Sequence, residues 1–452
     1  MKSIPDENAK RRIKEIYALA TFIAAHPNST ASHAKDAQEI SPSCRTSLFY
    51  YLNEAIANGW IERIGATKAA VYRATPQFQH HLAKLSLSLP VSARPKVSYR
   101  GEFMGTYIPN ETYYLSAEQR KNLNAICPKG SFDATDERIA HEVRRFMADL
   151  THNSSAFEGV AVKYADTISF LEENIESKHM SPIDAVILRN HYNAIRFIVE
   201  NTHYPPQPED ILVSEYDTRN IHAFLSDGLL KDRRKQGRLR TEHVEIRDSC
   251  YIPNNIPAVI AQEFGALMAK AAAIEDPHEA SFFLLVHIPY LQPFEDCNKR
   301  TARLICNIPL LRNGILPISW SEVNQRDYTD SLLCIYERNS TYGLAEVYVD
   351  AFRRSYERFD IAINQRQPSR LEVSYAPQIM DAVRRRILHN DSSLSMGVEP
   401  IHIAEFEAIV EDKLDGIREN EMIGGPYRLR PAEIRHWVEV ERRNTQPSDQ
   451  PN

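Results

Sequence analysis

The sequence lacks the marks of secreted, disulfide-bonded and membrane proteins. Its six cysteines are scattered and form no Cys-x-x-Cys pair, which argues against zinc sites and disulfide frameworks and is typical of a reducing cytoplasm. Residues 1–12 are polar and contain no apolar signal-peptide core. The longest apolar stretch, from Phe282 to Leu291, is interrupted by His287 and Pro289 and is too short to span a membrane. We therefore expect a cytoplasmic protein without a membrane partner.

Several common enzyme motifs are also missing. His141-Glu142 and His278-Glu279 each lack the second His of a zinc-protease motif, and there is neither a Gly-x-x-x-x-Gly-Lys-Ser/Thr loop nor a Gly-rich dinucleotide fingerprint. The net charge of −6 gives no general attraction to nucleic acid, so such binding requires a local patch. With 43% hydrophobic and 25% charged residues, the chain is typical of a globular protein. Its 452 residues suffice for about two to four domains.

One polar stretch, Leu291 to Arg303, stands between two apolar runs, which predicts a buried helix, a short loop and a second helix. Free backbone N–H groups and the helix dipole at the start of the second helix attract phosphate. Asp296 could hold Mg²⁺ against that phosphate. Arg300 and Arg303 are three residues apart, so both would lie on one side of the first turn and clamp phosphate oxygens.

This stretch resembles the signature loop of the Fic (Fido-fold) proteins, His-x-Phe-x-Asp/Glu-Gly-Asn-Gly/Lys-Arg-x-x-Arg. The matching positions are Phe294, Asp296, Asn298, Lys299, Arg300 and Arg303. Gln292 stands where the family has its catalytic His, and Cys297 stands where it has Gly. A branch of Fic-like proteins reads Gln-Pro-Phe-Glu-Asp here, so Gln292 could be a feature of that branch.

The resemblance implies that ATP lies with its phosphates over Cys297, Asn298, Lys299 and Arg300. Asp296 would bind Mg²⁺, Asn298 and backbone N–H groups would orient the α-phosphate, and Arg300 and Arg303 would take the β- and γ-phosphates. Phe294 would be a buried wedge that fixes the loop. Members of the family transfer AMP from ATP to a Ser, Thr or Tyr hydroxyl of a target protein and release pyrophosphate.

Gln292 cannot replace the family's His as a general base. Its amide has no pKa near neutrality, so it can orient a hydroxyl but cannot accept the proton. The loss is worth on the order of 10² to 10⁴ in rate, whereas positioning and electrostatic stabilisation survive it. We therefore expect weak or altered transfer. His287, five residues upstream, is predicted to be a core histidine, and Cys297 lacks the neighbouring His that would make it a nucleophile.

A second part of the sequence resembles the inhibitory motif of the family, Ser/Thr-x-x-x-Glu-Gly/Asn. Ser154, Glu158 and Gly159 match it, inside a long region from Thr135 to Ile175 that is predicted to be helical. In the family, this Glu reaches the second arginine of the signature loop, here Arg303, and blocks productive placement of the γ-phosphate.

The N-terminal segment has the pattern of three helices followed by a β-hairpin. The helices are predicted over residues 9–25, 30–39 and 41–57, and the hairpin strands over 60–64 and 69–73. This order resembles a winged helix-turn-helix, whose third helix enters the DNA major groove. The candidate DNA contacts are Ser43, Arg45 and Thr46 in the groove, with Lys68 and Arg73 on the wing. A role in protein contact or dimerisation is the alternative.

The fold class we predict is mainly α, with four parts. A winged helix-turn-helix (1–85) is followed by a linker or packed arm (86–134), a Fic-like core (135–362) and a C-terminal helical domain (369–443) that could serve dimerisation or partner docking.

Within the core, the segment from Val244 to Ile246 resembles the family's flap hairpin, which holds an extended target beside the loop by β-pairing. The strongly basic run from Lys231 to Arg240 could steer an acidic target or nucleic acid, or simply be a solvated loop. Two functions stay open: an AMP transferase restrained by Glu158, and a nucleotide-sensing, DNA-binding regulator without catalysis.

Overall fold

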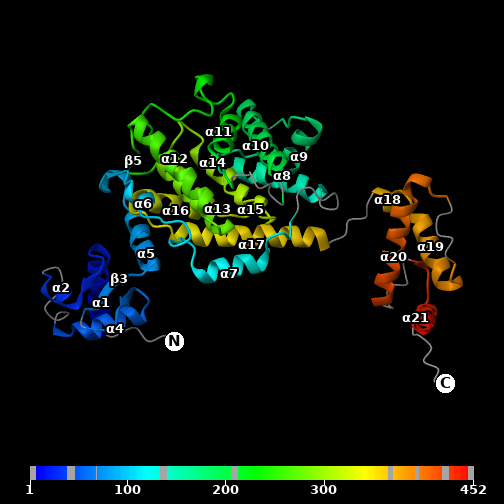
Figure 1. Ribbon diagram of the computed structural model, residues 1–452, viewed down its shortest axis with the longest axis horizontal. Helices are drawn as coiled ribbons and strands as arrows, with labels where there is room; N and C mark the ends of the chain where they lie inside the picture. Colours follow the sequence, from blue (N-terminus) through cyan, green and yellow to red (C-terminus); the bar gives the residue numbers. More distant parts are fainter. Residues whose placement is uncertain are drawn as a thin grey trace. The chain divides into compact units, whose positions relative to one another are not determined.

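The computed structural model describes most of the chain, and its described helices confirm the mainly α-helical prediction (Figure 1). The described residues are 7–37, 46–67, 69–132, 140–178, 180–202, 204, 212–364, 370–391, 397–419 and 427–445. They divide into two compact units, one ending at Ile363 and the other beginning at Asn364. Within these ranges, no helix is both long and apolar enough to cross a membrane.

The N-terminal elements form a small domain with its own core. They are α1 (Glu7–Ala25), β1 (Ser29–Thr30), α2 (Ala31–Asp36), α4 (Leu48–Ala57), β2 (Ile61–Ile64), β3 (Val71–Ala74) and α5 (Pro76–Leu87). The strands pair antiparallel in the order β1-β3-β2, so the predicted hairpin is present and β1 adds a third strand. Thr30 caps α2 by accepting the His33 N–H at 3.2 Å. Leu19, Ile23 and Leu52 are fully buried between the helices.

The segment after α5 packs into the main core of the first unit. Its elements are η1 (Val91–Ala93), β4 (Val97–Ser98), α6 (Glu102–Gly105) and α7 (Ala117–Ile126). The buried carboxylate of Glu279 fixes this arm by accepting the backbone N–H groups of Tyr114 and Leu115 and the hydroxyl of Tyr107, at 2.6, 3.0 and 3.1 Å. Because Tyr107 and Leu115 belong to the same buried cluster as the helices that follow, the arm is part of the core.

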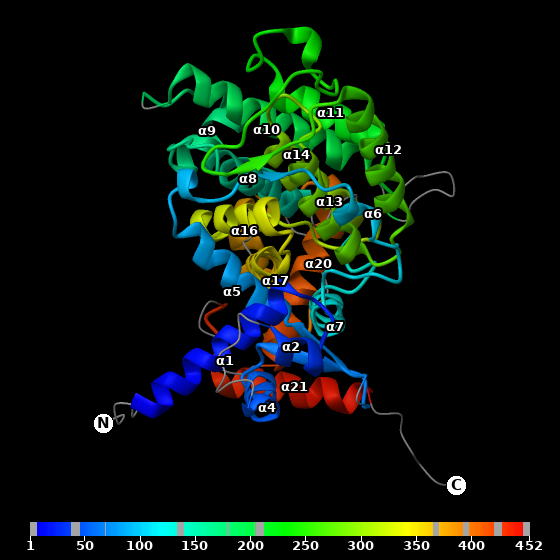
Figure 2. The same ribbon diagram turned by 90° about the vertical axis from the view of Figure 1, so that its left-hand side faces the viewer.

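The main core is a bundle of helices around α13. Its elements are α8 (Ala140–Ala156), α9 (Tyr164–Glu173), α10 (Pro182–Asn201), α11 (Glu215–Ser226), η3 (Arg233–Lys235), β5 (Tyr251–Ile252), α12 (Pro257–Ala273), α13 (Pro277–Leu291), α14 (Asn298–Ile305), α15 (Asn307–Arg312), α16 (Gln325–Arg338) and α17 (Tyr342–Asn364). Every residue of α13 is buried, as expected for a helix that is apolar on all sides. It contacts α12, α14, α15 and α16, while α10, α11 and α14 lie side by side (Figure 2).

Two local predictions differ from the structure. The long helical region predicted up to Ile175 is interrupted, because α8 ends at Ala156 and Gly159 turns the chain with a φ of +90°. The flap hairpin predicted around Val244 to Ile246 does not form: residues 239–250 contain no strand. The buried Arg240 instead holds the start of this segment in place, because its guanidinium donates to the carbonyl oxygens of Gln292, Glu242 and Asn254.

The arm, the end of this loop and α16 meet at one buried carboxylate, Glu337. It pairs with Arg94 at 2.6 Å and also accepts the Ser249 hydroxyl at 2.9 Å and the Cys250 N–H at 3.2 Å. Next to this carboxylate β4 pairs in parallel with β5. Glu337 thus holds three segments that are far apart in the sequence.

Glu337→Gln should destabilise the first unit by about 1.5 to 3 kcal/mol, because the buried acceptor of three hydrogen bonds loses its negative charge and Arg94 is left without its counter-charge. Urea unfolding at neutral pH measures the change. Glu346→Gln on the exposed surface of α17 is the matched control and should stay within about 0.5 kcal/mol of wild type. Equal effects of the two substitutions would contradict the role of Glu337 in holding the three segments together.

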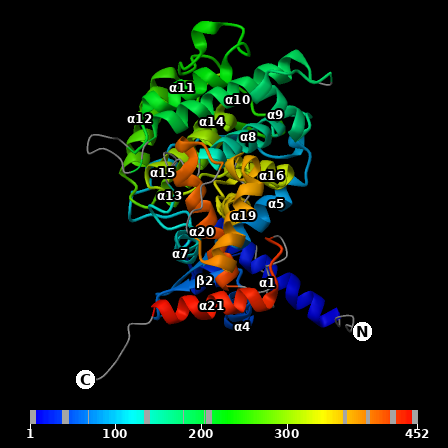
Figure 3. The ribbon, with the colours of Figure 1, turned by 90° about the vertical axis from the view of Figure 1, so that its right-hand side faces the viewer.

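The second unit has a separate core. Its elements are α18 (Arg370–Ser374), α19 (Ala376–His389), η4 (Pro400–His402), α20 (Ile403–Glu419) and α21 (Pro431–Thr445). Helix α19 packs against both α20 and α21 (Figure 3). Fully buried apolar residues such as Val383, Phe406 and Ile434 fill the space between them. The apolar faces of these helices therefore pack against one another within the unit.

Candidate active site

The loop between α13 and α14 is bounded by two residues in the left-handed backbone conformation. Gln292 ends α13 with a φ of +52°, and Cys297 precedes α14 with a φ of +61°. This conformation costs a residue with a Cβ roughly 1–2 kcal/mol. Cys297 therefore occupies a position that suits glycine, and the loop keeps its shape despite that cost.

Side chains inside the loop are bonded to one another. Asn298 Nδ2 donates to Gln292 Oε1 and to the Phe294 carbonyl, each at 2.9 Å, and Asn298 Oδ1 accepts the Phe294 N–H at 2.9 Å. Gln292 Nε2 donates to the Pro289 carbonyl at 2.7 Å. Both ends of the Asn298 amide therefore hold the loop, and its role in orienting a phosphate stays a prediction.

A histidine that the sequence pattern does not single out supports this loop from α11. The ring of His222 stacks on Phe294 with centroids 3.9 Å apart and planes at 8°. Its Nδ1 accepts the Gly237 N–H at 3.0 Å, so Nε2 carries the proton and donates to the Asp296 carbonyl at 3.2 Å. Burial lowers the pKa of His222 to about 4, outweighing its hydrogen bond to the Asp296 carbonyl. His222 is thus a neutral support, and Phe294 is the buried wedge that the resemblance implies.

His222→Gln should reduce stability by about 1–3 kcal/mol at pH 7.5, because the stacked ring is lost and its two hydrogen bonds are disturbed. The difference in stability between wild type and variant should be smaller at pH 5. Between pH 6.5 and about 4, His222 binds a proton in the unfolded chain but not in the folded protein, so wild type loses stability as the pH falls. Urea unfolding at both pH values measures this. His243→Gln, at an exposed position, controls for removal of an imidazole. A gap of equal size at both pH values would contradict the assignment.

The two arginines of α14 converge on Glu158, at the turn after α8. Arg303 Nη2 lies 2.7 Å from Glu158 Oε1, and Arg300 Nε lies 3.4 Å from Glu158 Oε2. Arg303 also donates two hydrogen bonds to Ser154, from Nε to the hydroxyl and from Nη2 to the backbone carbonyl, both at 3.1 Å. Burial alone would raise the pKa of Glu158, but Arg303 and Arg300 outweigh it and lower the pKa to about 2. The carboxylate is therefore charged at every physiological pH and pairs with both cations, while Arg300 also pairs with Asp296.

A cavity of about 150 Å³ opens over this loop. It is lined by Glu158, Val244, Glu245, Ile246, Arg247, Gln292, Glu295, Asp296, Cys297, Asn298, Lys299, Arg300 and Tyr336. Most of the predicted nucleotide-binding residues thus face one cavity, together with the predicted target-binding segment. Phe294 and Arg303 do not line it: Phe294 is buried beneath the loop, and Arg303 lies behind Glu158 with an exposed fraction of 1%.

Asp296 fits the predicted role of a magnesium ligand in part. Its side chain is 63% exposed and pairs with Arg300 Nη2 at 3.1 Å. Among the described residues, no group of three or more His, Cys, Asp or Glu side chains is placed to hold a metal ion. Mg²⁺ commonly takes only one or two carboxylates and completes its shell with phosphate and water, so Asp296 suffices only if a phosphate is bound as well.

Neither Cys297 nor His287 offers reactive chemistry in this arrangement. Burial raises the pKa of the Cys297 thiol to about 12, so it is not a thiolate nucleophile. His287 is buried, accepts or donates one hydrogen bond with the Tyr114 hydroxyl at 2.8 Å, and has a pKa lowered by burial to about 3. His287 is therefore a core residue, as predicted.

The candidate DNA contacts are only partly described. Ser43, Arg45 and Lys68 lie outside the described residues. Thr46 is exposed just before α4, and Arg73 on β3 donates to Asn28 Oδ1 at 2.9 Å. DNA binding therefore stays a prediction.

Comparison with known proteins places one family on this site. Residues 212–310, which include the whole loop, match the model of the Fic/DOC family. A comparison with curated protein sequences finds no match. Similar solved structures include a Fic domain containing signaling protein from Bacteroides thetaiotaomicron (19% identity, 55% of this chain and 98% of that chain, TM-score 0.43), a Fic family protein from Desulfovibrio desulfuricans (17%, 70% and 92%, 0.45) and Fic-1 from C. elegans (16%, 79% and 85%, 0.42). At these identities and TM-scores they carry no argument about activity.

Proposed function

We propose that this protein, whose residues 212–310 match the model of the Fic/DOC family, binds Mg²⁺-ATP over its Gln292–Arg303 loop and transfers AMP slowly to a hydroxyl of a target protein. The observation that carries the proposal is the pairing of Glu158 with both Arg303 and Arg300. Two buried arginines held by one carboxylate form a ready anion site once that carboxylate leaves, since guanidinium groups bind phosphate oxygens in pairs.

Different residues of the chain would have different roles in such a transfer. Arg300 and Arg303 would hold the terminal phosphates after Glu158 is displaced, and Asp296 would hold Mg²⁺ beside them. The first backbone N–H groups of α14 would meet the α-phosphate. The bound Mg²⁺ would neutralise phosphate charge. Gln292 lines the cavity with an amide already committed to Asn298 and Pro289. It therefore positions the loop but takes no proton, and the reaction runs without a dedicated general base.

Transfer of label from α-phosphate-labelled ATP tests the proposal. Wild type, Glu158→Gly, and Glu158→Gly with Arg300→Ala are incubated with Mg²⁺, alone and with a cell lysate. We expect labelled protein with Glu158→Gly, and its loss when Arg300 is also replaced. ATP bound by Glu158→Gly in calorimetry, without label on any protein, would reject AMP transfer. That result would favour the alternative of a nucleotide-sensing, DNA-binding regulator.

A further inference from the structure

The strongly basic run identified in the sequence is fixed to the loop at three points. From here on, the basic rim means Lys231, Arg233, Arg234, Lys235 and Arg238. Gly237 donates its N–H to His222, whose ring supports Phe294. Arg240 donates its backbone N–H to the Pro293 carbonyl at 2.9 Å and its Nε to the Gln292 carbonyl at 2.6 Å.

The third attachment is an ion pair. Lys235 Nζ lies 2.6 Å from Glu295, a residue that lines the cavity, and 2.8 Å from Glu242. At Gly237 a Cβ would come within 2.9 Å of the Arg219 carbonyl, and φ is +68°, so glycine permits this close contact with α11. These contacts hold the segment against the loop, so it differs from a solvated charged loop that makes no contact with the rest of the protein.

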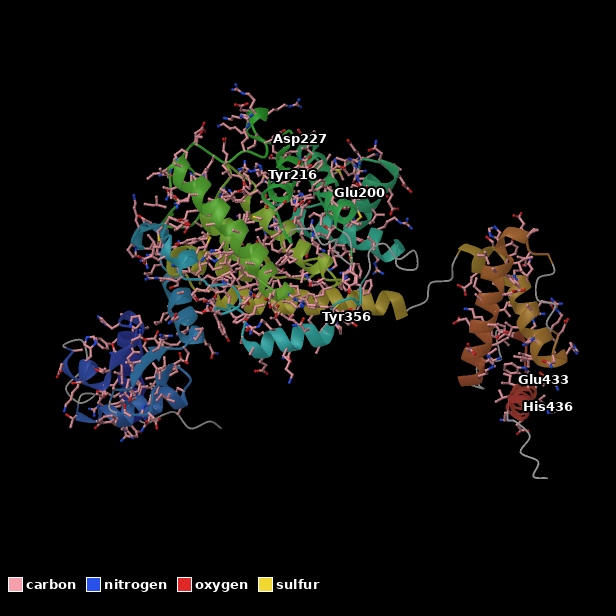
Figure 4. The ribbon with its side chains drawn as sticks, in the orientation of Figure 1. Glu200, Tyr216, Asp227, Tyr356, Glu433 and His436 are labelled. Carbon is pink, nitrogen blue, oxygen red and sulfur yellow. The ribbon has the colours of Figure 1, made fainter. Side chains whose placement is uncertain are left out.

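The rest of the basic rim is turned to solvent. The segment 231–240 contains six Lys or Arg against one Asp, in a chain whose net charge is −6. Arg234, whose side chain is 82% exposed, pairs only with the adjacent Asp232 among the described residues. The described residues offer no acidic partner within ion-pair distance to Lys231, Arg233 or Arg238, all of which are exposed. Figure 4 shows this segment projecting from the body of the core beyond Asp227, the residue that follows α11.

We propose that the basic rim is the docking surface for an acidic segment of the target protein, next to the hydroxyl to be modified; this rests on the proposed function. Clustered charge beside a cavity steers a ligand of opposite sign and sets its register. An acidic segment also competes for Lys235 and so releases Glu295 at the edge of the cavity. Because the segment is short and fixed beside the loop, it suits a peptide that must reach the cavity better than a long polyanion.

A binding measurement without nucleotide tests the basic rim separately from transfer. Fluorescein-labelled peptides of equal length, one of Glu and Ser and one of Gln and Ser, are titrated with the full chain and followed by fluorescence anisotropy. We expect the acidic peptide alone to bind, more weakly as salt is raised. Arg233→Glu with Arg238→Glu should weaken it by ~10-fold or more.

The matched control is Arg326→Glu with Arg353→Glu, which changes the net charge equally at two other exposed arginines. It should change the affinity by less than about 2-fold. Equal effects of the two double variants would overturn the proposal, as would a single-stranded oligonucleotide that binds the rim more tightly than the acidic peptide. Since no nucleotide is present, these outcomes stand whether or not AMP transfer is observed.

Discussion

Replacing Glu158 by Gly should tighten the binding of Mg²⁺-ATP by on the order of 10²-fold. Arg303 and Arg300 lower the pKa of this carboxyl from 4.5 to about 2 although burial opposes the change. The shift corresponds to about 3 kcal/mol of favourable interaction between the carboxylate and its surroundings, which a competing phosphate must overcome. Isothermal titration calorimetry of wild type and variant measures the change.

The same substitution should lower stability in the absence of nucleotide. Without Glu158, the buried Arg303 loses its counter-charge, and an uncompensated buried charge costs about 3–5 kcal/mol. Saturating Mg²⁺-ATP should restore much of that loss, because a ligand that binds only the folded state stabilises it by mass action. Thermal unfolding with and without ATP therefore gives an independent measure of whether ATP takes the place of the carboxylate.

Glu245→Gly is the matched control for both measurements. Glu245 lines the same cavity and carries the same charge, but its side chain is 86% exposed and contacts neither arginine. It should leave ATP affinity within about 2-fold of wild type and should not make stability depend on ATP. If both variants raise the affinity equally, the effect comes from the general field of the cavity, and Glu158 is not a specific block.

The helices could be predicted from the sequence because their signals are local. Ser181 and Ser214 begin α10 and α11 with capping boxes, and Pro182 and Pro257 occupy first helical positions. Three or four residues suffice for such signals, so the first turns of these helices can be located from the sequence alone. The spacing of Arg300 and Arg303, which places both on one side of a helical turn, is equally local.

The supports of the loop could not be predicted, because they join residues that are far apart in the sequence. His222 lies 74 residues before Asp296, whose carbonyl accepts its hydrogen bond, and Arg240 lies 52 residues before Gln292. Neither residue has a neighbour that marks it as functional, and in a helical pattern His222 reads as an ordinary buried position. The failed flap prediction has the same origin, because Arg240 ties this segment to Gln292 and Asn254, and no local pattern marks those contacts.

Gln292→His, made together with Glu158→Gly, should raise the rate of AMP transfer by on the order of 10² to 10⁴ over Glu158→Gly alone. An imidazole near its ordinary pKa of about 6.5 accepts the hydroxyl proton that an amide cannot. His is among the residues that tolerate the left-handed conformation found here at a φ of +52°, so the loop should keep its shape.

Kinetics of the two variants identify the cause of the gain. Arg300 and Arg303, which we propose bind the phosphates, do not contact Gln292, so kcat should rise while KM for ATP stays nearly constant. The rate should increase with pH as the imidazole loses its proton. Gln292→Asn in the same background is the control, because it replaces one amide by another and should give no gain. Equal rates with and without the Gln292→His substitution would mean that proton removal does not limit transfer. In that case the amide bonded to Asn298 and Pro289 would be all that this position contributes, and the limit would lie in binding of the target or release of pyrophosphate.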